Sequence, residues 1–392
     1  EKRKECWPHS EIPTATKTTC GECSLGCEIY VNADKGKRNV VRVTTELGSP
    51  TSPTRGLCCF KARTFHLKRQ RPEINKDIKE TLPELVDFLR SEGVVSLFLG
   101  NSLSNEEYES IKEFLNRKGQ NIAVSILEAD DFKAFTSLAE EANLKRCTLG
   151  QIYESDVVFV IDENMDQEVP LITTMLRKNV REDGLKVIYL GSDPGLLDRG
   201  TTILLRTDVA EIYPILESFT DERLIKKASE LSGIKETTLV RAINTLKSAR
   251  HPIFLAGPKV TSNASSAKAF VKLCSTLGKC SYIPLYRGAN TEGALRVLGD
   301  ILTPTIDNLS MIKKGQVTKL VLVEPDQATV EVLQGVNADN RAKCALLTSR
   351  SFEDIKADLV MPIAGWYERR GKVINVSGEI LKQEITVIPQ KK

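Results

Sequence analysis

Three cysteines near the start of the chain, Cys20, Cys23 and Cys27, lie in one short stretch, CGECSLGC. A pair of adjacent thiols, Cys58 and Cys59, follows in the stretch RGLCCFKAR. A cubane 4Fe-4S cluster takes four thiolates, so a tight loop that supplies three of them and a fourth from elsewhere would meet that need. Glycine and serine in the first stretch allow the loop to curl, so that backbone amides can face the cluster and offset its negative charge. The spacing therefore predicts a 4Fe-4S site.

Other uses of these thiols remain open. A structural zinc site normally draws on two CxxC-like pairs, whereas the side chains of adjacent cysteines do not readily face one ion. The thiols could also be unliganded or joined in disulfides. Cys274, Cys280 and Cys344 stand apart from the cluster in apolar stretches, and we interpret them as small core residues.

The overall composition is that of an ordinary globular protein. The 55 basic and 52 acidic residues nearly cancel, and the net charge of +3 gives no reason to expect a nucleic-acid partner. No apolar run reaches the roughly 18 residues of a membrane span, and the stretch EKRKECWPHS lacks the apolar core of a secretory signal. Ten cysteines in 392 residues are too sparse for a disulfide scaffold. We expect a cytoplasmic protein without direct membrane insertion; because the sequence starts at Glu1 rather than at a methionine, an upstream segment is left open.

The texture of the sequence changes near residue 72. Residues 1–72 carry short alternating runs and turn-rich segments, which are typical of a small loop-and-strand domain. Beyond them, amphipathic helical stretches alternate with strongly apolar ones such as VVSLFLG, DVVFVID and PIFLAG. Strand-like runs separated by helices indicate parallel sheets covered on both faces. The length accommodates two consecutive doubly wound α/β units.

The cysteine stretches resemble a known family. The segments TTCGECSLGCEIYV, VVRV and RGLCCFKAR are similar to the amino-terminal iron–sulfur domain of the molybdopterin oxidoreductases, in which the fourth cysteine follows Gly-x-x and precedes x-Lys. Gly56 and Lys61 set this register, so the resemblance makes Cys59 rather than Cys58 the fourth ligand. It also implies that Lys61 contacts the cofactor, because the matching lysine of catalytic relatives lies between cluster and pterin.

The resemblance implies an α/β fold in which a small iron–sulfur domain precedes two doubly wound Rossmann-like domains. The expected domains are residues 1–72, a discontinuous unit of 73–145 with 306–392, and an inserted unit of 146–305. Residues of about 366–383 are expected to pack back on the cluster domain, with Trp366 and Tyr367 in that interface.

Within the superfamily, Trp7, the stretch RTFHLKRQRP and the compact length look most like the large iron–sulfur (G-type) subunit of respiratory complex I, without its C-terminal β domain. This implies an electron-transfer subunit of a multi-subunit redox complex: a complex I-like NADH dehydrogenase, a hydrogenase or a formate dehydrogenase module. The implied partners are redox subunits with iron–sulfur or flavin centres, which could hold the chain at the inner face of a membrane.

Several departures from the family argue against a bound molybdopterin. No cysteine or suitable serine stands where a metal ligand is expected before the strand DVVFVID, and Asp162 replaces a glycine that gives access to the cofactor. The family's Asn-x-Glu-Gly-Arg becomes the segment from Asn375 to Glu379, with a carboxylate in place of the arginine. Each misplaced charge would cost about 1 to 4 kcal/mol beside a pyrophosphate. We expect a scaffold that is not catalytic by itself.

Two alternatives remain. One is a catalytic molybdenum or tungsten bis-pterin oxidoreductase, such as a formate dehydrogenase whose last domain is on another chain. The other is a structural subunit with zinc or no metal. His66, close to the cluster in sequence, could tune a cluster potential, although a solvated surface histidine is the favoured interpretation.

Overall fold

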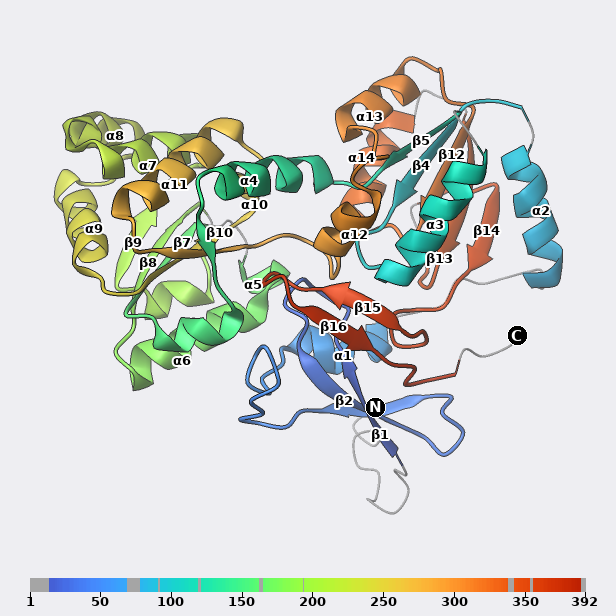
Figure 1. The fold of residues 1–392 in the computed structure, drawn as a ribbon, viewed down its shortest axis with the longest axis horizontal. Coiled ribbons are helices and arrows are strands. Elements are labelled where there is room, and N and C mark those ends of the chain that lie inside the picture. The colour runs from blue at the N-terminus through green and yellow to red at the C-terminus, as the bar shows by residue number, and fades with distance from the viewer. Residues whose placement is uncertain are drawn as a thin grey trace.

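The structure, a computed structural model, describes residues 14–68, 78–90, 92–118, 121–161, 165–192, 194–337, 342–352 and 355–388. Trp7 and Asp162 lie outside these residues. Within the described ranges the strands form sheets of three, six, five and two strands. Figure 1 shows the six-stranded and five-stranded units side by side, with the small sheets below them.

The N-terminal unit is an antiparallel meander covered by one helix. Its strands are β1 (Thr14–Thr19), β2 (Glu28–Ala33) and β3 (Val40–Thr44), and α1 (Phe60–Lys68) packs on β3. Ile29 and Val31 of β2 are fully buried, which gives the meander an apolar side. The pairing of Thr19 with Glu28 ends the β1–β2 ladder, so residues 20–27 form its connecting loop.

The five-stranded sheet is assembled from two distant parts of the chain. Its parallel strands run in the order β14-β13-β12-β4-β5. They are β4 (Val95–Leu99), β5 (Ile122–Ser125), β12 (Lys319–Val323), β13 (Lys343–Thr348) and β14 (Leu359–Pro362). Leu97 and Leu99 enter one apolar core and Phe98 the opposite one, so both faces are buried. The helices of this unit are α2 (Ile78–Arg90), α3 (Asn105–Lys118), α12 (Thr291–Leu298), α13 (Thr305–Lys313) and α14 (Gln327–Asn337).

The six-stranded sheet is formed by the residues between these two parts. It is also parallel, with the order β6-β11-β10-β7-β8-β9. The strands are β6 (Lys145–Arg146), β7 (Val157–Ile161), β8 (Lys186–Gly191), β9 (Ile203–Arg206), β10 (Pro252–Ala256) and β11 (Ser281–Pro284). Val158 and Val160 face one core while Phe159 faces the other.

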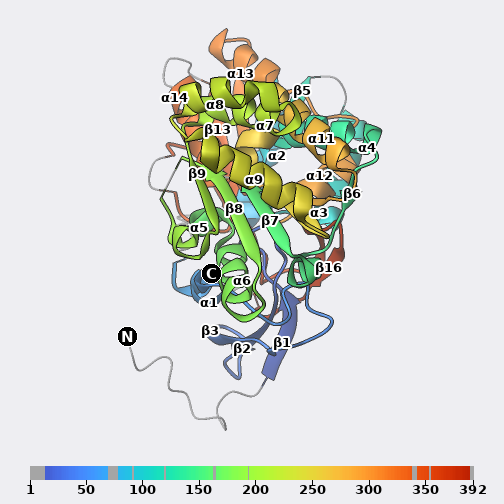
Figure 2. The ribbon, with the colours of Figure 1, turned by 90° about the vertical axis from the view of Figure 1, so that its left-hand side faces the viewer.

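Helices cover both faces of this second sheet. Figure 2 shows α7, α8 and α9 on one side of the strands and α6 on the other. The helices are α4 (Ala129–Glu141), α5 (Met165–Glu168), α6 (Pro170–Glu182), α7 (Ile212–Thr220), α8 (Ile225–Ser232), α9 (Glu236–Ser248), α10 (Pro258–Thr261) and α11 (Ala264–Leu277). The strand order reverses between β4 and β12 in the five-stranded sheet and between β7 and β10 in the six-stranded sheet, which confirms the predicted pair of doubly wound units. The exact domain bounds given above remain a prediction.

A C-terminal hairpin joins the three larger units. It consists of β15 (Gly371–Ile374) and β16 (Ile380–Gln383), and it packs against β1, α3 and α12. Just before it, the Trp366 ring lies 4.7 Å from that of Phe65 in α1 and is almost fully buried. Among the helices that the structure describes, none has the length and apolar character that crossing a bilayer requires.

Candidate metal centre and the adjoining cavity

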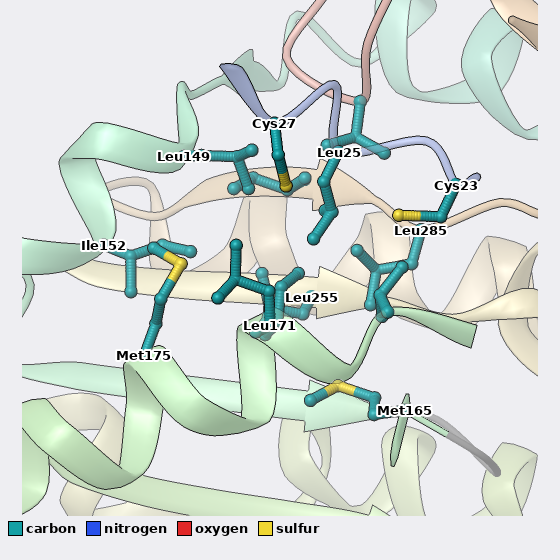
Figure 3. Packing of buried hydrophobic residues seen from close by; sticks show 14 of the residues in the cluster. Cys23, Leu25, Cys27, Leu149, Ile152, Met165, Leu171, Met175, Leu255 and Leu285 are labelled. Atoms are coloured by element: carbon teal, nitrogen blue, oxygen red, sulfur yellow. The ribbon is translucent and has the colours of Figure 1, made fainter. Parts of the chain in front are cut away.

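The loop of residues 20–27 is a closed, buried turn. Cys20 N–H donates to the Cys27 carbonyl at 2.9 Å, which brings the two ends of the loop together. Cys20, Cys23 and Cys27 are only 3%, 7% and 2% exposed. In Figure 3, Cys23 and Cys27 lie on either side of Leu25, above the apolar side chains of the six-stranded unit. The loop is therefore held between its own meander and a second domain.

The C-terminal hairpin covers the loop from another side. Gly26 has a φ of +66°, and a Cβ there would stand 2.3 Å from Cδ1 of Leu381 in β16. The Val376 N–H donates to the Ser24 carbonyl at 2.9 Å, and the indole N–H of Trp366 donates to Glu22 at 2.8 Å. These contacts fix the loop and exclude water from its inner side.

Cys58 and Cys59 reach the same region from the start of α1. Both are half-buried and pack against the core that contains the loop cysteines. Burial raises the pKa of Cys23 and Cys27, and the charge of Cys59 adds to this rise in both. The Cys58 thiol also interacts with Cys27, but it hydrogen-bonds Arg63 and Thr45. The contacts thus favour Cys59 as the thiol that joins the loop.

The surroundings of the loop thiols disfavour their charged thiolate forms. Burial raises the pKa of Cys23 to about 12 and that of Cys20 and Cys27 well above the usual range. Backbone N–H groups of Glu22 and Leu25 hydrogen-bond the sulfurs of Cys20 and Cys23 and offset part of this rise in pKa. Thiolates in such a place need bound cations. Ligands that are all sulfur, with backbone amides facing them, suit a metal centre that prefers thiolates, such as an iron–sulfur cluster.

The described cysteines are all free thiols. No group of three or more His, Cys, Asp or Glu side chains in the described part of the chain is arranged to hold one metal ion. In a cubane each iron takes a single thiolate, so the four cysteine sulfurs bind four different irons and do not gather around one ion.

Lys61 is the second residue of α1 and lies between the cysteine loop and the six-stranded unit. Its ammonium group donates to the Glu168 carbonyl at 3.4 Å, and its charge lowers the pKa of Cys23. His66 is farther along α1, where its ring meets that of Phe65 edge-on at 5.5 Å. Its Nδ1 is buried without a hydrogen-bond partner among the described residues, and burial lowers its pKa. His66 is therefore not the solvated surface residue that the sequence favoured.

A cavity of about 680 Å³ begins at the outer side of the cysteine loop. It lies beyond the carboxyl ends of β4 and β12, where the order of the five-stranded sheet reverses, and such crevices are the usual ligand sites of doubly wound sheets. Charged residues from all three units line it: Glu22, Lys61, Glu168, Arg287, Glu324, Asp326 and Arg350.

The charges in this cavity largely satisfy one another or the backbone. Buried Glu324 accepts from the Ser349 N–H at 2.6 Å, and Asp326 accepts from Asn101 Nδ2 at 3.3 Å. Arg287 pairs with Glu128 at 3.1 Å and with Glu168 at 3.5 Å. Sequence reasoning missed this cavity. The available signal was polar residues directly after apolar strands, as in LFLGN and LVLVEPD.

The carboxylates of this cavity do not include Glu379, which the sequence analysis placed beside a pterin pyrophosphate. Glu379 accepts from Asn375 Nδ2 at 2.9 Å inside the β15–β16 turn and does not line the cavity. Glu22, Glu168, Glu324 and Asp326 do line it, against three cationic side chains. A lining with this excess of carboxylates is a poor fit for a dinucleotide pterin.

Residues 72–392 match the sequence model of a family described as molybdopterin oxidoreductase. The chain belongs to the molybdopterin oxidoreductase family. This matched region contains both parallel sheets and the C-terminal hairpin, while the cysteine loop precedes it.

A relative matches almost the whole chain. The chain is 24% identical over 441 residues to a G-type subunit of NADH-quinone oxidoreductase from Rhizobium meliloti (strain 1021), which confirms the resemblance predicted from the sequence. The match covers 93% of this chain and 50% of that protein, so the chain spans about half the length of this relative.

Solved structures show the family fold. Acetylene hydratase from Pelobacter acetylenicus superposes with a TM-score of 0.65 at 12% identity, over 96% of this chain and 67% of that one. A chain of the formyltransferase/hydrolase complex from Methylorubrum extorquens, solved with methylofuran, gives 0.58 at 12% identity, over 80% and 92%. At such identities the likeness concerns the fold alone, and it confirms the predicted fold class.

Proposed function

We propose that this member of the molybdopterin oxidoreductase family is an electron-transfer subunit of a multi-subunit redox complex, in which the loop cysteines and Cys59 hold one 4Fe-4S cluster. One observation carries the proposal: Cys20, Cys23 and Cys27 are buried as free thiols in one loop, and Cys59 packs against the same core. The identity to a subunit of NADH-quinone oxidoreductase supports a complex I-like setting.

The residues of the chain would divide the work at such a centre. A bound cluster would supply reversible one-electron transfer. The hairpin contacts of Gly26 and Trp366 keep water away from the loop sulfurs. Lys61 places positive charge near Cys23, which favours the more negative state of the centre. Cys58 and Cys59 are less buried than the loop cysteines, so this is the side on which a donor or acceptor can approach.

The proposed partners are redox subunits that carry iron–sulfur or flavin centres, because a single cluster needs a donor and an acceptor. We propose a cytoplasmic location, at the inner face of a membrane where those partners bind it. We also propose that no molybdopterin is bound, and that the two parallel sheets serve as a scaffold. The carboxylates around the 680 Å³ cavity support this view.

The cavity also gives a second candidate some support. It adjoins Lys61 and lies where the five-stranded sheet reverses its order, so a ligand there would stand beside the proposed cluster. The second candidate is a catalytic molybdenum or tungsten bis-pterin oxidoreductase, such as a formate dehydrogenase with its last domain on another chain.

Anaerobic purification followed by metal analysis separates these functions. We expect about four irons per chain, and a cubane signal in electron paramagnetic resonance after reduction. Stoichiometric molybdenum or tungsten would favour the second candidate. Zinc in place of iron would end the electron-transfer proposal.

Two neighbouring variants test the ligand set. Cys59→Ser removes the thiol that interacts with Cys23 and Cys27, and we expect it to lose most of the iron. Cys58→Ser is the matched control, because that thiol hydrogen-bonds Arg63 and Thr45, and it should keep its iron. The reverse pattern would assign Cys58 as the fourth ligand, and equal retention by both would refute a four-thiolate cluster at this site.

A further inference from the structure

Two cysteines far from the loop also lie close together. Cys274 is in the last turn of α11, and Cys280 directly precedes β11. Gly278, with a φ of +67°, ends the helix and reverses the chain, and its N–H donates to the Cys274 carbonyl at 3.0 Å. The Cys280 thiol donates to the same carbonyl at 3.2 Å. The helix end thus carries the two thiols on one short turn.

The two thiols differ in access. Cys274 is 1% exposed and belongs to the apolar core under α7 and α11. Cys280 is half-buried at the edge of that core, so the sequence interpretation as a core residue holds for Cys274 but not for Cys280. The reason is the turn at Gly278, which returns the chain to the sheet at its surface. A dissolved reagent can therefore reach Cys280 first.

The two thiols also differ in acidity. A hydrogen bond from the Cys274 thiol lowers the pKa of Cys280, whereas burial raises that of Cys274. A thiol that is partly exposed, has a lowered pKa and lies next to a second thiol has the features of a reversible oxidation site.

We propose that Cys280 is an oxidant-reactive modification site, and that Cys274 resolves its oxidised form into an internal disulfide. The oxidant class is a low-molecular-weight disulfide. The Cys280 thiolate attacks one sulfur of the reagent, which forms a mixed disulfide and releases one reagent thiolate. Cys274 then attacks the Cys280 sulfur and its proton passes to the departing reagent sulfur, which forms the protein disulfide and releases the second reagent molecule as a thiol. Two protein thiols lose two electrons, and the reagent gains them.

A third thiol, that of Cys147, also lies near Cys280. Cys147 follows β6, next to β11, and is within electrostatic range of Cys280. Its own thiol faces the Tyr282 carbonyl at 3.6 Å, and it is almost fully buried. Cys274 is therefore the better resolving thiol.

Such a disulfide would protect Cys280 from further oxidation but would change the fold little. It closes only the turn from residue 274 to residue 280, so it adds little constraint to the fold. It does keep the reachable sulfur from advancing to sulfinic acid, from which thiols do not return it. The site would let the chain pass through oxidising episodes and be restored by a reductant.

The test uses the full chain, purified anaerobically and treated with glutathione disulfide. Free thiols are blocked with N-ethylmaleimide before digestion with trypsin. Cleavage after Lys279 separates the two cysteines, so the disulfide appears as peptide 273–279 linked to peptide 280–287, two hydrogens lighter than their sum. Addition of dithiothreitol should release both peptides. Absence of this linked pair, with Cys280 unmodified, overturns the proposal.

Variants assign the two roles. In Cys274→Ser, Cys280 should remain as the glutathione mixed disulfide, and in Cys280→Ser, Cys274 should stay reduced. Cys344→Ser, which alters a buried cysteine on β13, is the matched control and should form the linked pair as the parent does. A link from Cys280 to Cys147 would overturn the role of Cys274. The peptide map of the parent chain decides the main point even if a variant folds poorly.

Discussion

The cysteine loop and the charged cavity meet at Gly21 and Glu22, yet they handle polar atoms in opposite ways. In the loop, thiols are buried where their charged forms are strongly disfavoured, and no other cysteine in the described residues pairs with them. In the cavity, carboxylates and cations contact one another or the backbone. Buried thiols that cannot bear charge without a bound cation need an occupant, whereas carboxylates and cations that contact one another can be stable without one. This difference favours a cluster-binding subunit over a pterin enzyme.

Iron removal should give the largest effect. Chelation under anaerobic conditions takes the cations from the loop thiols, and we expect the N-terminal unit to lose several kcal/mol of stability because metal binding is coupled to folding. Hydrogen–deuterium exchange should rise strongly in residues 17–31 and little in 322–330 beside the cavity. Equal exchange in the metal-bound and metal-free proteins would show that the loop does not need a bound metal any more than the cavity does.

Gly56→Ala should rank second, because it disturbs the turn that delivers Cys59. Gly56 has a φ of +74°, and an added Cβ would stand 1.7 Å from the Glu46 carbonyl oxygen. We expect a loss of about 3 kcal/mol or more together with loss of iron.

Gly48→Ala in the same turn is the control for Gly56→Ala. Its φ is +79°, but an added Cβ would have no atom within 4 Å. It should cost only about 1 kcal/mol and keep the iron. Thermal unfolding and iron content measure both variants, and similar losses in the two would mean that backbone strain, rather than contact with Glu46, governs this turn.

Glu324→Gln should give a smaller effect, confined to the cavity. Glu324 is 5% exposed and accepts from Ser349, and an amide keeps only one acceptor oxygen. We expect a loss of about 1 to 2 kcal/mol in urea unfolding and unchanged iron content. Glu331→Gln, on the exposed side of α14, should change neither value. Iron loss in Glu324→Gln would show that the two regions are not independent.

The smallest effect should come from His66. Its pKa in the folded protein is lowered from 6.5 by burial, so below that pH the unfolded chain binds more protons than the folded one. Stability is thus fully present above about pH 6.5 and falls as the pH decreases below it. Unfolding measured from about pH 7.5 to 5.5 in the parent and in His66→Gln should show a shallower decline in the variant. If the two proteins lost stability equally as the pH falls, His66 would not contribute to this pH dependence.

Local chemistry and global assembly were not equally predictable. The apolar runs of β7 and β10 predicted a parallel sheet, and the spacing of Cys20, Cys23 and Cys27 predicted a common site, because each signal lies within a few residues. The cavity was not predicted: polar residues after two apolar runs were a signal, but Asn101 and Asp326 come together only when the chain returns to pair β12 with β4.

Two single residues illustrate the same limit. Glu379 was expected beside a pyrophosphate, but the turn between β15 and β16 directs it to Asn375. Cys280 was interpreted as core, but the helix end at Gly278 brings it back at the margin of the apolar core, where it is only partly buried. In both residues the deciding factor is a turn whose direction depends on what it packs against, which no short pattern of residue types contains.

The hairpin that covers the cysteine loop has a consequence for biogenesis. Leu381 and Trp366, which close the loop, leave the ribosome only after both large sheets have been synthesised, although the loop itself emerges first. A nascent chain would therefore expose the proposed metal ligands before the residues that cover them have been synthesised. We expect a cluster at this site to be enclosed only after the chain is complete.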